Sequence, residues 1–269
     1  MTARLDAELV RRGLARSRRQ ASELIAAGRV RLDGAPVLRA ATGVEENGTL
    51  VVGDDPDDPG YASRAGHKLA GALDAWEPNG LAVAGRDCLD AGAGTGGFTD
   101  VLLRRGARHV VAVDVGHGQL RPEIGADPRV DAREGVNVRE LRAGDVVPPP
   151  GLVVADLSFI SLRLVLAPLA AVAAGDADLV VLVKPQFEVG RERLGSGGVV
   201  RDTSARRDAV LGVLSAADAA GLTLRDLAVS PLPGHEGNVE FFCWLRGAAA
   251  AGGAGPDRAR IDAVLGGTS

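Results

Sequence analysis

The stretch Cys88-Leu-Asp-Ala-Gly-Ala-Gly-Thr-Gly-Gly-Phe98 joins an apolar run to a glycine-rich turn and the start of a helix. Glycine has no Cβ, so the backbone of such a turn can approach a ligand closely, and the helix N-terminus offers free N–H groups to it. The spacing Gly92-x-Gly94-x-x-Gly97 also fits the dinucleotide fingerprint. The stretch therefore predicts a cofactor site at the first turn of a Rossmann-like α/β domain.

The chain around this turn alternates apolar strand candidates with helical segments from residue 61 onward. We expect strands at 87–90, 110–114, 129–132, 152–156, 179–184, 224–230 and 239–245, and helices at 97–105, 162–174 and 204–220. Such alternation predicts a parallel, doubly wound sheet. The last two strands are joined by a turn too short for a crossover, so this pair should be antiparallel. A seven-stranded sheet of this kind is typical of class I S-adenosylmethionine-dependent methyltransferases.

The N-terminal segment has a different character. Residues 1–44 contain nine arginines and four acidic residues, although the whole chain has a net charge of −4. Their pattern predicts two short helices, the second capped by Ser17, and a hairpin over 30–37 around an Asp-Gly turn. A small basic module on an acidic body indicates a polyanionic partner. We predict RNA contacts from Arg4, Arg16, Ser17, Arg18, Arg19, Arg29 and Arg64.

This N-terminal pattern resembles the S4 RNA-binding domain. The resemblance is carried by Arg4-Leu-Asp6, Gly13, Ser17-Arg18, Ala21, Leu24-Ile25, Gly28, Val30 and Val37. It implies recognition of folded RNA by shape and backbone. We therefore divide the chain into an S4-like domain with an acidic linker at 1–60, a methyltransferase domain at 61–246, and an Ala/Gly-rich tail at 247–269 with a short helix near its end.

Asp114, at the end of the next strand, suits a ribose hydroxyl in either a dinucleotide or S-adenosylmethionine, but two features favour S-adenosylmethionine. Asp90 precedes the glycines, where an anion could accept from the cofactor's amino group, and the motif begins well inside the domain, after a helix that carries Lys68. A dinucleotide-dependent enzyme with an RNA-binding head stays open as an alternative. The predicted cofactor contacts are Asp90, Gly92, Gly94, Thr95, Gly96, Gly97, Phe98, Asp114, Val115 and Asp156.

The chain's use of lysine is selective. Of its 31 basic residues only Lys68 and Lys184 are lysines, which marks both as positions where arginine would fail. Lys184 and Asp156 fall at carboxyl ends of predicted parallel strands, where ligands bind in such sheets. Lys68 lies on the helix before the first strand, and Glu240 begins the last one. We predict these four residues as the catalytic group, with the carboxylates holding the lysines.

Two other methyl transfers fit the residues less well. Methylation of a base amino group usually follows an Asp/Asn-Pro-Pro-aromatic run, but residues 156–159 read Asp-Leu-Ser-Phe. Methylation of a pyrimidine carbon needs a nucleophilic cysteine beside the substrate. Cys88 and Cys243 both lie inside apolar strands and read as reduced, buried residues. Methyl transfer to a ribose hydroxyl, which needs in-line placement and removal of one proton, is favoured.

Seven motifs together resemble the TlyA family, whose members are often labelled hemolysin A and join an S4 domain to an FtsJ-like methyltransferase. They are 61–69 (YASRAGHKL), 89–99 (LDAGAGTGGFT), 114–120 (DVGHGQL), 155–162 (ADLSFISL), 182–188 (LVKPQFE), 197–202 (GGVVRD) and 230–241, from Ser-Pro-Leu-Pro-Gly to Gly-Asn-Val-Glu-Phe. The resemblance implies cytidine 2′-O-methylation in ribosomal RNA, within ribosomal subunits. It also implies that Lys68, Asp156, Lys184 and Glu240 form the catalytic set.

The remaining expectations concern location and partners. No apolar stretch is long enough to span a bilayer, and the N-terminus has no signal-peptide pattern. We expect a cytoplasmic protein that binds no metal and no membrane and needs no obligate protein partner. A membrane-active, hemolysin-like protein and a non-catalytic RNA-binding protein remain the alternative functions.

Overall fold

A computed structural model describes residues 2–15, 17–53, 59–234, 236–249 and 255–267. The chain forms two compact units, Met1–Gly60 and Tyr61–Ser269. Each has its own hydrophobic core.

The first unit packs two helices against short strands. Helix α1 (Leu5–Arg11) and helix α2 (Arg18–Ala26) are followed by β2 (Val30–Leu32), β3 (Ala35–Pro36) and β5 (Leu50–Val52), which form a small antiparallel sheet in the order β3-β2-β5. Strands β1 (Ala3–Arg4) and β4 (Gly43–Val44) pair separately. The Ser17 hydroxyl accepts from the Gln20 N–H at 3.2 Å, so the predicted cap of the second helix is present.

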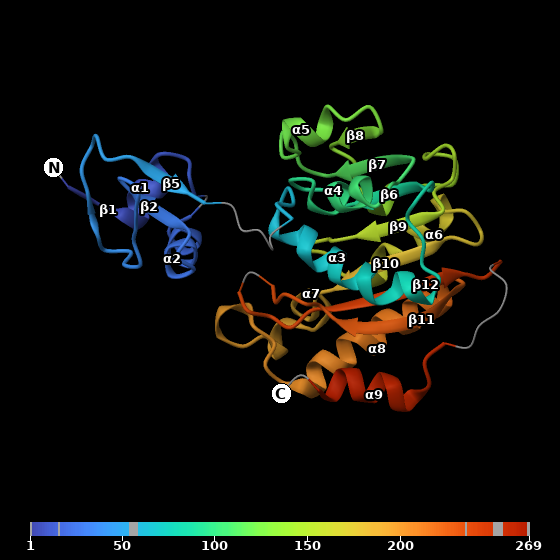
Figure 1. Cartoon of the computed structure of the whole chain (residues 1–269). Coiled ribbons are helices and arrows are strands. Elements are labelled where there is room, and N and C mark those ends of the chain that lie inside the picture. The colour runs from blue at the N-terminus through green and yellow to red at the C-terminus, as the bar shows by residue number, and fades with distance from the viewer. Residues whose placement is uncertain (1, 16, 54–58, 235, 250–254, 268–269) are drawn as a thin grey trace. The chain divides into compact units, whose positions relative to one another are not determined.

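The second unit is built on one seven-stranded sheet (Figure 1), as the sequence predicts. Its strands run in the order β11-β12-β10-β9-β6-β7-β8. Their bounds are β6 (Asp87–Ala91), β7 (His109–Asp114), β8 (Val130–Glu134), β9 (Leu152–Ala155), β10 (Asp178–Val183), β11 (Leu222–Val229) and β12 (Phe241–Gly247). Strands β6 to β10 are parallel, and β12 is antiparallel to both β10 and β11.

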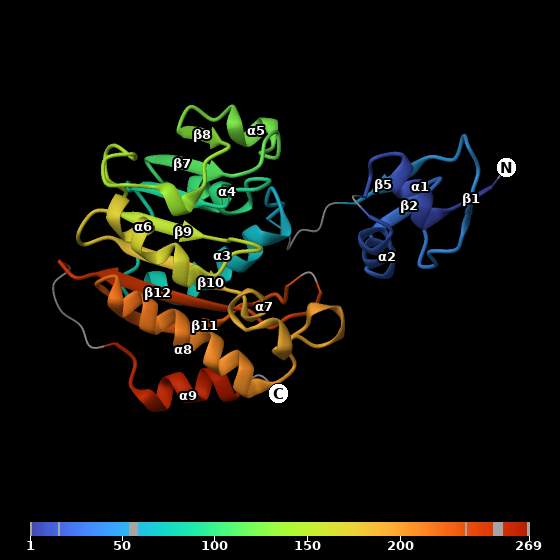
Figure 2. The ribbon, with the colours of Figure 1, turned by 180° about the vertical axis from the view of Figure 1, so that it is seen from behind.

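The helices of this unit cover both faces of the sheet (Figures 1 and 2). Helices α3 (Arg64–Trp76) and α4 (Gly97–Arg104) pack on one face, while α6 (Leu166–Val172), α8 (Thr203–Ala219) and α9 (Arg258–Gly266) pack on the other. The central strands read as continuous apolar runs because successive side chains enter opposite cores. In β10, for example, Val180 lies in the core under α3 and Val181 in the core under α8.

Several short elements connect this framework. They are α5 (Pro122–Gly125), α7 (Pro185–Glu188) and the 3-10 turns η1 (Glu77–Asn79), η2 (Val138–Glu140), η3 (Leu162–Leu164), η4 (Arg191–Arg193) and η5 (Ser196–Gly198). The loops after the parallel strands gather at one edge of the sheet, where the cofactor turn and most of the predicted catalytic residues lie. Within the described residues, no helix is both long and apolar enough to cross a membrane.

Candidate active site

The glycine turn after β6 forms one wall of a cavity of about 570 Å³. Gly92 has a left-handed backbone, and a Cβ placed there would lie 2.7 Å from the carbonyl oxygen of Asp156. The turn can therefore pass this close to the backbone that follows β9 only with glycine at this position. Gly94 donates its N–H to Asp114 at 2.8 Å, which fixes the turn against the end of β7.

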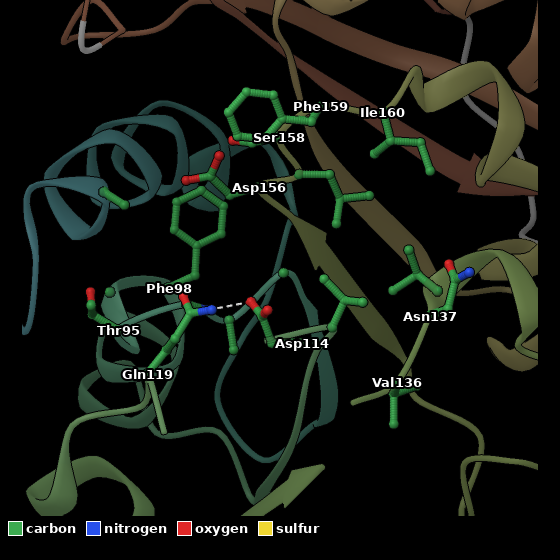
Figure 3. Close-up of a pocket in the computed structure, with 18 of the residues that line it drawn as sticks. Thr95, Phe98, Asp114, Gln119, Val136, Asn137, Asp156, Ser158, Phe159 and Ile160 are labelled. Carbon is green, nitrogen blue, oxygen red and sulfur yellow. Dashed lines mark hydrogen bonds between the residues drawn. The ribbon is translucent and has the colours of Figure 1, made fainter. Parts of the chain in front are cut away.

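Most of the predicted cofactor contacts line this cavity. Figure 3 shows Phe98, Asp114 and Asp156 directed into it, with Val136 and Asn137 opposite. The predicted residues that line it are Gly92, Gly94, Thr95, Gly97, Phe98, Asp114, Val115 and Asp156.

Asp90 and Gly96 lie away from the cavity wall. Asp90 is fully buried, and its Oδ2 accepts from the Thr99 hydroxyl at 2.6 Å. Burial raises the pKa of Asp90 to about 7, although the Thr99 hydrogen bond favours the charged form. Its Oδ1 is also buried and has no hydrogen-bond partner among the described residues, and a contact from Asp90 to a cofactor amino group stays a prediction. Gly96 directly precedes α4 as its N-cap residue and faces Leu120 and Ile124.

The four predicted catalytic residues form two ion pairs. Lys184 follows the last residue of β10, and its Nζ lies 2.7 Å from Asp156 Oδ1 and donates to the Ser158 hydroxyl at 2.8 Å. Lys68 on α3 donates to Glu240 Oε2 at 2.5 Å. Lys68 is 8 % exposed and Glu240 is 2 % exposed, so this second pair is shielded from water. Glu240 immediately precedes β12, where the sequence placed it within the strand.

A second cavity of about 540 Å³ brings the two pairs together. Lys68, Lys184 and Glu240 all line it, while Asp156 and Lys184 line the first cavity. Lys184, Ser158 and Phe159 border both spaces. Both lysines of the chain therefore line the second cavity, and Lys184 lies at its boundary with the first.

Some lining residues were missed by the sequence prediction. Phe159 has a left-handed backbone, is 92 % exposed, and lies 5.2 Å from Phe187 between ring centroids. A φ above zero is unusual for a bulky residue and often marks a functional loop. The only sequence signal was its place directly after Asp156-Leu-Ser. Asn137 and Val136 follow β8, a strand whose loop was given no role.

The residues predicted to contact RNA differ in the partners that they bond within the protein. Arg4 and Arg18 both bond to Asp6, at 3.1 Å and 2.8 Å, so the structure brings these two together. Arg19 pairs with Glu23 on the exposed face of α2. The Arg29 Nε donates to the Gly53 carbonyl, the Ser17 hydroxyl is used as a helix cap, and Arg64 begins α3 of the second unit. Arg16 lies outside the described residues.

Comparison with known proteins resolves the family. Residues 61–247 match the FtsJ-like methyltransferase model, and residues 3–50 match the S4 domain model. The chain belongs to the TlyA family of FtsJ-like methyltransferases. It is 55 % identical over 244 residues to the Mycobacterium tuberculosis 16S/23S rRNA (cytidine-2′-O)-methyltransferase TlyA, an alignment that covers 91 % of this chain and 90 % of the relative.

Other relatives support the same assignment. The protein YqxC of Bacillus subtilis is 38 % identical, over 90 % of this chain and 85 % of that protein. A solved structure described as a hemolysin from Streptococcus thermophilus aligns with a TM-score of 0.77 and 34 % identity, covering 99 % of this chain and 95 % of that one. That structure thus has the same fold as this chain over nearly its whole length.

Proposed function

We propose that this chain transfers a methyl group from S-adenosylmethionine to the ribose 2′-hydroxyl of cytidine in ribosomal RNA, within ribosomal subunits. One observation carries the proposal: the chain's two lysines each meet a carboxylate beside the second cavity, and one of them, Lys184, also borders the first. The names of the relatives supply the nucleotide and the class of RNA.

The first cavity suits the cofactor. Its glycine turn leaves backbone close to the ligand space, and Asp114 at the end of β7 can accept from ribose hydroxyls. Val136, Val138 and Ile160 supply apolar surface for a purine ring. Bound S-adenosylmethionine would supply an electrophilic methyl group on a sulfonium. The residues present therefore fit that group, and Asp114 and the turn would hold it.

The second cavity would hold the target nucleoside. Lys184 borders both spaces, so its Nζ can contact a hydroxyl placed between them. The ammonium stabilises negative charge that develops on the hydroxyl oxygen. Once the Lys184 amine has released a proton to solvent, it can accept the hydroxyl proton. Asp156, whose Oδ1 lies 2.7 Å from Nζ, then stabilises the ammonium that forms again.

Lys68 and Glu240 have a different task in this proposal. Glu240 fixes the Lys68 ammonium at the edge of the second cavity, where it can donate to a ribose oxygen and hold the sugar. Correct placement of the hydroxyl relative to the methyl carbon is a large part of such a reaction. The exposed arginines of the first unit, Arg18 and Arg19 among them, would contact RNA phosphates.

The test uses the full chain, methyl-labelled S-adenosylmethionine, and separated small and large ribosomal subunits that lack the modification. Nuclease digestion and mass spectrometry should find 2′-O-methylcytidine at a defined position. Calorimetry should show binding of S-adenosylmethionine and none of NAD. Label on a base, or no transfer to either subunit, would overturn the proposal.

A further inference from the structure

The amine of Lys184 makes one aligned hydrogen bond within the described residues, and its acceptor is not the carboxylate. The Nζ donates to the Ser158 hydroxyl at 2.8 Å. Asp156 Oδ1 lies 2.7 Å from the same nitrogen, but this oxygen has no hydrogen-bond partner in the described part of the chain, so the two groups attract each other as charges without aligned geometry. Charge attraction keeps the nitrogen nearby, whereas a hydrogen bond also fixes the direction of one N–H.

The Ser158 side chain lies where the two cavities meet. It belongs to the segment that follows β9, two residues after Asp156, and Figure 3 shows both residues on this segment. Ser158 is exposed and borders both cavities, as Lys184 does. The hydrogen bond between Ser158 and Lys184 is therefore made at the place where the proposed reaction brings the ribose hydroxyl and the methyl group together.

A second contact ties the segment of Ser158 to that of Lys184. Glu188 is buried at the end of α7, the helix that begins directly after Lys184. Its two carboxylate oxygens accept from the Leu162 N–H at 2.7 Å and from the Ser161 hydroxyl at 2.5 Å. The backbones that carry the serine and the lysine are therefore held together independently of their own hydrogen bond.

The direction of the amine matters once Lys184 is neutral. An ammonium carries three hydrogens, whereas the neutral amine carries two hydrogens and one lone pair. The Ser158 hydroxyl takes one N–H, and the negative charge of Asp156 attracts the other, so the lone pair is left in the third direction. Without the hydroxyl, the amine can rotate between staggered positions about its last bond, and the lone pair faces the substrate only part of the time.

Resting on the proposed function, we infer that Ser158 is a positioning residue for Lys184: its hydroxyl fixes one N–H of the amine, so that the lone pair points to the ribose hydroxyl where the two cavities meet. Ser158 acts through Lys184 and does not take the proton itself. Asp156 supplies the charge that stabilises the ammonium, and Ser158 supplies the direction of the amine.

The experiment measures single-turnover methyl transfer to ribosomal RNA at saturating S-adenosylmethionine and a range of RNA concentrations. Ser158→Ala should lower the maximal rate by about tenfold to a hundredfold, because a reacting group that is poorly placed costs this much. The RNA concentration for half-maximal rate and the affinity for S-adenosylmethionine should each stay within about twofold of wild type, since only the reacting step is affected. Ser158→Thr keeps the hydroxyl at an exposed position and should recover most of the rate.

A double variant tests whether Ser158 acts through Lys184. In the background of Lys184→Ala there is no amine to direct, so adding Ser158→Ala should lower the remaining rate no further. A further fall of the size seen in the single variant would mean that Ser158 acts independently of the lysine, and would overturn the inference.

Ser161→Ala is the matched control, because it removes a hydroxyl from the same segment that does not meet Lys184, while the Leu162 N–H still holds Glu188. This variant should keep the wild-type rate. A wild-type maximal rate for Ser158→Ala, or a loss confined to RNA affinity, would show that the inference is wrong while the proposed function stands. If the wild-type chain does not methylate the ribose, the proposed function fails and this inference fails with it.

Discussion

The two units of this chain use positive charge in different ways. In the first unit the cations are arginines: the Arg4 and Arg18 side chains are more than half exposed, and both bond to Asp6. In the second unit two lysines lie beside cavities, with side chains only 10–11 % exposed and carboxylates within 2.7 Å. Arginine is a planar, permanently charged fork for phosphates, whereas a lysine amine can exchange a proton.

The carboxylates that pair with these cations also differ between the two units. Hydrogen bonds from Arg4, and then from Arg18, lower the pKa of Asp6 to about 2, so this carboxylate stays charged and orients the two guanidinium groups. Asp156 and Glu240 instead hold single ammonium groups next to the cavities. The ion pairs of the first unit therefore orient arginines that can attract RNA phosphates, whereas those of the second unit hold lysine amines beside the cavities.

The largest expected effect comes from Lys184→Ala, which removes the amine that borders both cavities. Methyl transfer in a single turnover should fall about 1,000-fold, the scale of a missing acid–base group. Cofactor affinity should change little, because the glycine turn and Asp114 are untouched. Methyl transfer by this variant at the wild-type rate would show that the Lys184 amine is not catalytic.

Removal of Lys68 should affect stability as well as transfer. Lys68→Ala leaves Glu240 buried without its partner, which costs about 3–5 kcal/mol of unfolding free energy. Denaturant unfolding checks this. Replacing both residues, Lys68→Met with Glu240→Leu, should restore most of the stability but none of the methyl transfer. Full activity in the double variant would make this pair purely structural.

The burial of Asp90 in the second unit should make the stability of the folded protein depend on pH. Its pKa is raised from 3.8 to about 7, so between these values the folded state holds a proton that the unfolded state has released. Stability from this group should therefore fall as pH rises from about 4 to 7, by roughly 4 kcal/mol as an upper figure.

Asp90→Asn should remove that fall, since the amide does not titrate. The stability difference between variant and wild type, measured by denaturant unfolding at several pH values, should grow in favour of the variant up to neutral pH. A constant difference across this range would mean that Asp90 does not carry a raised pKa.

The smallest expected effect concerns the first unit. Changing Arg18 and Arg19 together to Ala should weaken RNA binding and reduce its salt slope by about two, one for each phosphate that is no longer neutralised. Cofactor affinity should stay at the wild-type value. An unchanged salt slope would remove these arginines from the RNA interface.

Much of the fold follows from local sequence. The run ending in Gly97 predicted a strand, a turn and a helix start, and the structure has β6, the turn and α4 at these positions. Strand periodicity predicted the parallel sheet and its antiparallel end. The insertion of β12 between β10 and β11 was not predictable from alternation alone, because strand order depends on which edges remain free.

The site was predictable where a residue's place on a strand decides its position. Asp156 and Lys184 follow neighbouring parallel strands, and this is why they meet. The hydrogen bond from Thr99 to Asp90 was not predictable, because sequence order does not reveal which partners a buried side chain meets. Ser158 carried no sequence signal of its own, since its role depends on the amine that it meets in the folded chain.

Two single variants test the central claim most directly: Lys184→Arg in the second unit and, for comparison, Arg18→Lys in the first. Both keep one positive charge at the same place. We expect Lys184→Arg to bind S-adenosylmethionine yet lose nearly all methyl transfer to ribosomal RNA, while Arg18→Lys keeps most of its RNA affinity and its transfer rate. Wild-type transfer by Lys184→Arg would show that a fixed charge suffices there, and would contradict the account.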